Sequence, residues 1–119
     1  MKTKTRISFG LAVLSVIGLS FSAHAASPTK AELKNGKAQF VENCAVCHQK
    51  DAIGKAGVAP SLTNPELLSI ASDKFFMSTI RDGREDTGMP PFAHLGRKGV
   101  RDIVSFLRSK ATLPNRSAE

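Results

Sequence analysis

The sequence predicts an all-α domain, and three observations support this prediction. Residues 29–32 read Thr-Lys-Ala-Glu, the Thr-x-x-Glu pattern that is typical of a helix start. Near the other end, apolar side chains recur with the helical period at positions 100, 103, 104 and 107. No segment alternates apolar and polar residues as a half-buried strand does. We therefore expect helices and loops without a sheet.

The first helix is expected to begin after Thr29 and to continue to the region of Cys44. Glycine inside a helix costs about 1 kcal/mol relative to alanine, so Gly36 predicts the close approach of another backbone. At such a crossing Phe40 can meet Phe106 of the last helix. One face of the first helix carries Leu33, Gly36, Phe40 and Val41.

The middle of the chain predicts loops and short helices. Glycine, proline and asparagine interrupt any periodicity over residues 49–64, which indicates an irregular loop. Asn64 can cap a helix that begins at Pro65, and Ser72 or Asp73 can cap another.

The second of these short helices is expected to stop near Gly83. Two glycines and two prolines exclude a regular helix across residues 84–96. The last helix then carries the apolar stripe Val100, Ile103, Val104 and Leu107, has Phe106 at its edge, and ends near Lys110.

The N-terminus has the organisation of an export signal. Basic residues precede an apolar run over residues 7–21, and residues 23–25 read Ala-His-Ala, a pattern that signal peptidase can cut. An uncleaved membrane anchor is the alternative, but the run is short for a bilayer and is diluted by serines. We expect residues 1–25 to be a signal peptide cleaved after Ala25, and residues 26–119 to form one periplasmic domain without a stable membrane span.

Charge and composition narrow the choice of partners. The chain has a net charge of +7, which falls to about +4 once the three basic residues of the signal are removed. The charges are scattered and the chain has no Tyr or Trp, so nucleic-acid binding is not expected. Two interpretations stay open: a positive docking face for an acidic protein partner, and a solvated surface without a function.

Residues 44–48 read Cys-Ala-Val-Cys-His and contain both cysteines of the chain. Cys-x-x-Cys-His is the attachment signature of c-type haem, in which the thiols add to the two haem vinyl groups and the histidine ligates the iron. The predicted cofactor is therefore one haem c, covalently attached at Cys44 and Cys47 and ligated by His48.

Other uses of two nearby cysteines fit this chain less well. A redox-active Cys-x-x-Cys is expected in a βαβ context, which a helical chain lacks. Structural zinc needs four ligands, and a disulfide between residues three apart closes too small a loop to add much stability. The candidate soft ligands after signal removal are Cys44, Cys47, His48 and His94.

Met77, Met89 and His94 are the candidates for the sixth iron ligand. Met77 lies inside a predicted helix, where methionine is most often a core residue. Met89 lies between Gly88 and Pro90 in a non-helical segment, which leaves its thioether free to turn toward a metal. The sequence therefore favours Met89.

With these residues assigned, the region from about residue 31 to 110 resembles the class I c-type cytochromes. The resemblance implies about three main helices, with short helices and loops, wrapped around one haem. It also implies that the Pro60 carbonyl accepts the ring N–H of His48, although a simple turn proline is the alternative. The absence of Tyr and Trp departs from the family, where these residues often bind the haem propionates. The matching residues are Gly36, Phe40, Cys44, Cys47, His48, Pro60, Met89 and Phe106.

The resemblance implies an electron carrier and not an enzyme. A His and Met pair fills both axial positions of the iron, leaves no site for a substrate, and raises the reduction potential. We therefore expect a periplasmic protein whose haem cycles between Fe(II) and Fe(III), taking electrons from a protein donor and passing them to a protein acceptor. The alternatives are an electron-entry subunit of a larger oxidoreductase complex and, less favoured, a haem enzyme or gas sensor with an open iron position.

Overall fold

A computed structural model describes residues 26–111, so the predicted signal peptide and residues 112–119 lie outside the described residues. Within 26–111 the only β pairing is two isolated bridges, and the predicted all-α fold is confirmed. The elements in chain order are α1 (Lys30–Asn43), α2 (Ala45–His48), α3 (Pro65–Ile70), α4 (Asp73–Asp82), the 3-10 helix η1 (Ala93–Leu95) and α5 (Gly96–Ala111).

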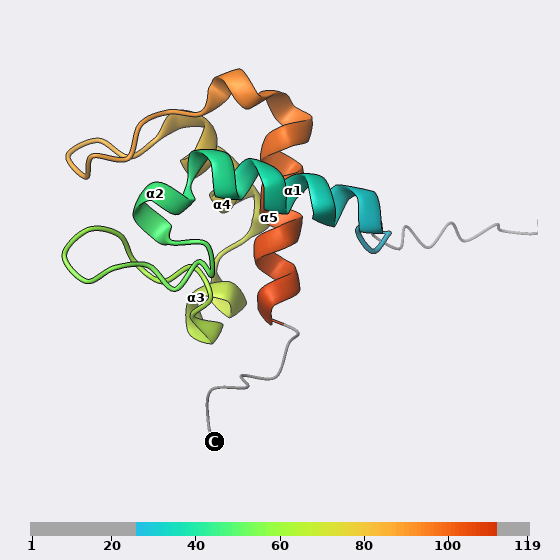
Figure 1. The fold of residues 1–119 in the computed structure, drawn as a ribbon, viewed down its shortest axis with the longest axis horizontal. Helices are drawn as coiled ribbons and strands as arrows, with labels where there is room; N and C mark the ends of the chain where they lie inside the picture. The colour runs from blue at the N-terminus through green and yellow to red at the C-terminus, as the bar shows by residue number, and fades with distance from the viewer. Residues whose placement is uncertain (1–25, 112–119) are drawn as a thin grey trace, which may run out of the picture.

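The first and last helices, α1 and α5, cross at the centre of the fold (Figure 1). The crossing is close because Gly36 has no side chain: a Cβ atom added there would lie 1.9 Å from the backbone oxygen of Asp102. Beside this contact the rings of Phe40 and Phe106 pack with their centroids 5.5 Å apart. The predicted close approach of the two helices at Gly36 and the predicted contact between Phe40 and Phe106 are therefore both confirmed.

The core is built on this crossing and is completed by α3 and α4. The predicted apolar stripe of the last helix is buried throughout. Val41 departs from expectation, because it is 36% exposed instead of sharing the buried face of α1. The large buried apolar side chains are Phe40, Leu68, Phe76, Ile80, Val100, Ile103, Val104, Phe106 and Leu107.

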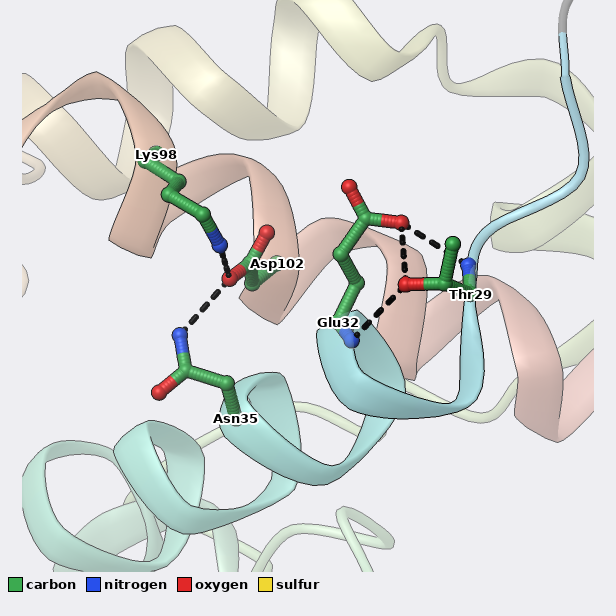
Figure 2. Close-up of polar contacts among 5 residues, drawn as sticks. All are labelled: Thr29, Glu32, Asn35, Lys98 and Asp102. Carbon is green, nitrogen blue, oxygen red and sulfur yellow. Dashed lines mark hydrogen bonds and ion pairs between the residues drawn. The ribbon is translucent and has the colours of Figure 1, made fainter.

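A buried carboxylate also joins the two helices (Figure 2). Asp102 of α5 is fully buried, and its Oδ2 accepts hydrogen bonds from Asn35 Nδ2 and Lys98 Nζ, both at 2.6 Å. Its other oxygen, Oδ1, is buried and has no hydrogen-bond partner among residues 26–111. Burial raises the pKa of Asp102, but the bonds from Lys98 and Asn35 outweigh burial and leave the pKa below its ordinary value.

The helix starts follow the predicted capping chemistry. Thr29 accepts from the Glu32 N–H, and the Glu32 carboxylate accepts from the Thr29 N–H, which completes a capping box (Figure 2). Asn64 caps α3, and Ser72, not Asp73, caps α4 by accepting from the Phe75 N–H. Among the helices of residues 26–111, none has the length and apolarity to cross a membrane.

Candidate haem site

The Cys-x-x-Cys-His motif lies where the chain turns from α1 into α2. Cys44 is the C-cap of α1 and the N-cap of α2, and the motif's histidine is the last residue of α2. Both thiols are free in the described part of the chain, with Cys47 exposed and Cys44 packed against the core. Burial raises the pKa of the Cys44 thiol to about 11.

His48 is buried, and its ring Nδ1 lies 3.1 Å from the backbone oxygen of Pro60. A carbonyl oxygen can only accept a hydrogen bond, so this contact requires the ring proton on Nδ1. The other nitrogen, Nε2, then keeps its lone pair and can bind a metal. The histidine is thus held in the tautomer that an axial iron ligand needs.

The loop that carries Pro60 is folded back on α2 by its backbone. Gly54 N–H donates to the His48 carbonyl at 3.0 Å, and Leu62 N–H donates to the Ala52 carbonyl at 2.8 Å. Gly54 has a φ of +82°, and a Cβ atom there would lie 2.5 Å from the Pro60 oxygen. Only glycine therefore lets the Pro60 carbonyl come this close to the histidine.

The backbone of Met89 contacts the residues that directly follow α4. Arg84 N–H donates to the Met89 carbonyl at 3.1 Å, and a Cβ atom on Gly83, whose φ is +73°, would lie 2.7 Å from that same carbonyl. The Met89 side chain is half-buried against the core, as is Met77, whereas His94 is exposed. In Figure 1 the loops that carry Pro60 and Met89 project on the same side of the molecule as α2.

This donor set fits a haem. It offers two thiols on one helical turn, an imidazole with a free Nε2, and thioether sulfur at the edge of the core, which are the ligands that c-type haem uses. In residues 26–111 no three His, Cys, Asp or Glu side chains gather around a common point where they could hold a metal ion.

Solved structures of c-type cytochromes resemble this fold. Cytochrome CL from the marine methylotrophic bacterium Methylophaga aminisulfidivorans is 26% identical with a TM-score of 0.54, and the match covers 71% of this chain and 61% of that one. The c-type cytochrome NirC is 27% identical with a TM-score of 0.55, covering 73% of this chain and all of NirC.

The dihydro-haem d1 dehydrogenase NirN is 29% identical with a TM-score of 0.57. That match covers 71% of this chain but only 17% of NirN. The family described as cytochrome c oxidase, cbb3-type, subunit III matches residues 31–107, a span that includes the whole Cys-x-x-Cys-His motif, Pro60 and Met89. The chain belongs to this family and is a c-type cytochrome.

Proposed function

We propose that this cytochrome is an exported, non-enzymatic electron carrier with one haem c, attached at Cys44 and Cys47 and ligated by His48 and Met89. The observation that carries the proposal is the hydrogen bond between His48 Nδ1 and the Pro60 carbonyl at 3.1 Å. When bound, the haem supplies an iron that alternates between Fe(II) and Fe(III).

Each of the proposed site residues has a different role in holding the haem. Cys44 and Cys47 would hold the haem beside α2 through thioether bonds, which would keep it attached in both oxidation states. Pro60 keeps the His48 ring in one orientation and one tautomer, which limits the change in ligation when the iron changes charge. Met89 would supply the second protein ligand to the iron, a sulfur that favours Fe(II), which suits electron transfer and would exclude other ligands.

The surface beside the attachment motif supports docking of a protein partner. Val46, Ile53 and Val58 are 88%, 58% and 53% exposed, and they lie in α2 and the loop that follows it. Lys50 and Lys55 are exposed in the same stretch. We propose that a partner protein binds here, with an apolar patch of its own against these apolar side chains and acidic groups facing the lysines. Because salt screens the attraction between the opposite charges, electron-transfer rates should fall as ionic strength rises.

Mass spectrometry of the exported protein tests the proposal. Expression in a host with cytochrome c maturation machinery should give the chain 26–119 plus one haem, and the haem should survive acid-acetone extraction. The ferrous protein should not bind carbon monoxide readily, because both axial positions are filled. A bare polypeptide mass would refute covalent attachment, and rapid carbon monoxide binding would favour a haem enzyme or sensor.

A second candidate is an electron-entry subunit of a larger complex. Two findings favour it: the description of the matching family names an oxidase subunit, and the NirN match shows this fold within a much longer enzyme chain. Size-exclusion chromatography of the protein from its native cells separates the two candidates. A free carrier should elute at the size of a single small domain, whereas a subunit should elute with its partners.

A further inference from the structure

Arg108, near the end of α5, contacts the junction between α3 and α4. Its Nε donates to Asp73 Oδ1 at 2.7 Å, and its two terminal nitrogens donate to the carbonyls of Leu68 and Ala71. The guanidinium also lies over the Phe76 ring, 4.9 Å from its centroid. The Arg108 side chain is 27% exposed, so these contacts are partly shielded from water.

These contacts match the charges of the two helix ends. The last carbonyls of a helix lack partners within it and carry partial negative charge, and Leu68 and Ala71 lie at the C-terminal end of α3. Asp73 is the first residue of α4, where a carboxylate is favourable. Because a guanidinium presents several donors in one plane, Arg108 can bind both helix ends at once. It therefore clamps the junction.

The far end of α4 carries the segment that holds Met89. The ten residues of α4 span about 15 Å, and Phe76 and Ile80 bury one of its faces. At its C-terminal end, Ile80 accepts from the Phe92 N–H at 3.0 Å, and Gly83 packs on the Met89 carbonyl. A rigid helix thus connects the clamp at one end to the backbone of Met89 at the other.

We propose that Arg108 is a positioning residue for the sixth iron ligand. By fixing the α3–α4 junction it sets the position of α4, and through α4 it determines how firmly the Met89 sulfur stays on the iron. This inference rests on the proposed ligand set. Arg108 does not touch the donor atoms, so its role is to raise the fraction of molecules in which Met89 is bound.

The test uses the holoprotein and the binding of imidazole to its ferric form, followed by loss of the long-wavelength sulfur-to-iron absorption band. An external ligand must displace Met89, so its apparent affinity rises as the Met89-bound fraction falls. Arg108→Gln should bind imidazole about tenfold more tightly than the wild type and have a lower reduction potential. Arg108→Lys, which keeps the charge but loses the planar fork, should lie between them.

Two further variants separate positioning from general loss of stability. Ile103→Val removes one methylene from a fully buried residue of α5 that lies at the α1 crossing, so it should destabilise the fold without changing imidazole affinity. Asp73→Asn weakens one of the Arg108 contacts and should cause a smaller shift than Arg108→Gln. Asp73→Asn also serves if Arg108→Gln fails to fold.

The outcomes distinguish this inference from the proposed function. Equal imidazole affinity in the Arg108 variants and the wild type would overturn the positioning role, and so would an equal gain in affinity in Ile103→Val. If the wild type lacks the sulfur-to-iron band, or if Met89→Ala still shows that band, the proposed ligand set is wrong. The positioning inference, which rests on that ligand set, is then overturned with it.

Discussion

The α1–α5 crossing and the loops that carry Pro60 and Met89 are held in different ways. The crossing is held by tight packing, because the backbone of Gly36 lies against that of Asp102 and the Phe40 ring packs on Phe106. The loops depend on backbone hydrogen bonds and on glycines with positive φ, and much of their surface is exposed. Substitutions at the crossing should therefore change stability first, whereas substitutions in the loops should change ligation first.

Gly36→Ala should have the largest effect on stability. The added methyl would overlap the backbone oxygen of Asp102, and backbone at a helix crossing cannot move aside as a flexible side chain can. We expect the free energy of unfolding to fall by about 3 kcal/mol, even though alanine is the better helix former. Urea titration followed by circular dichroism measures this loss.

Gly99→Ala is the matched control on α5. A Cβ atom at Gly99 would lie 3.4 Å from the Leu95 side chain, which is an ordinary contact, so the change should be close to neutral. If Gly36→Ala and Gly99→Ala are equally mild, α1 and α5 do not approach each other as closely as the structure shows.

Met89→Ala should produce the largest change in ligation. It should abolish the sulfur-to-iron absorption band, lower the reduction potential and allow carbon monoxide to bind the ferrous iron. Met77→Ala should leave the spectrum unchanged and cost about 2 kcal/mol of stability, because Met77 is only half-buried against the core. Spectra and unfolding curves of the two variants provide the measurement. Loss of the band in Met77→Ala alone would move the sixth ligand to α4.

Local sequence signals predicted most of the fold. The capping box at Thr29, the caps at Asn64 and Ser72, and the stop at Gly83 each depend on residues within one or two turns, so they are visible in the sequence. The Gly36 crossing was also predictable, because glycine in a helix costs stability unless another backbone needs the space.

The candidate haem site could also be identified from neighbouring residues alone, because the Cys-x-x-Cys-His motif is five consecutive residues. The choice between Met77 and Met89 stays a prediction, because both side chains are half-buried at the edge of the core.

The polar contacts between residues far apart in the chain were not predicted from the sequence. Asn35 bonds to Asp102, which is 67 residues away, and Arg108 bonds to carbonyls about 40 residues earlier in the chain. Charged residues on an amphipathic helix are usually solvated, and nothing in the local sequence marks these two as exceptions. Asn35 reaches Asp102 only because α5 packs against α1, and Arg108 reaches its partners only because the end of α5 lies at the α3–α4 junction.

Asp102→Asn should have an intermediate effect and should depend on pH. The folded state holds the pKa of Asp102 below its ordinary value of 3.8, so its stabilising contribution is present above about pH 4 and is lost as the pH falls through the lowered pKa. At pH 7 the variant should lose about 1–3 kcal/mol, because the charge-assisted bond from Lys98 weakens and a buried amide group is left without a partner.

Thermal unfolding between pH 2 and pH 7 measures this effect. The gap between wild type and Asp102→Asn should narrow toward the acid end of the range. A gap that is constant over the whole range would mean that the charge of Asp102 does not stabilise the crossing.

Thr29→Ala should have the smallest effect, and it tests the outer end of α1. The change removes the acceptor for the Glu32 N–H and one of the donors to the Glu32 carboxylate, so we expect a loss of about 1 kcal/mol with no change in the haem spectrum. Ser72→Ala is the control, because Ser72 caps α4 through a single bond to the Phe75 N–H.

The pH dependence of Thr29→Ala distinguishes the two halves of the capping box. Hydrogen bonds from the backbone and side chain of Thr29 lower the pKa of Glu32, so the carboxylate half stabilises the helix start above about pH 4.5 and is lost as the pH falls through the lowered pKa. The effect of Thr29→Ala should therefore shrink in acid, whereas that of Ser72→Ala, which involves no titrating partner, should not. Equal losses for Thr29→Ala at pH 7 and pH 3 would show that the Thr29 side chain stabilises α1 only as an acceptor for the Glu32 N–H.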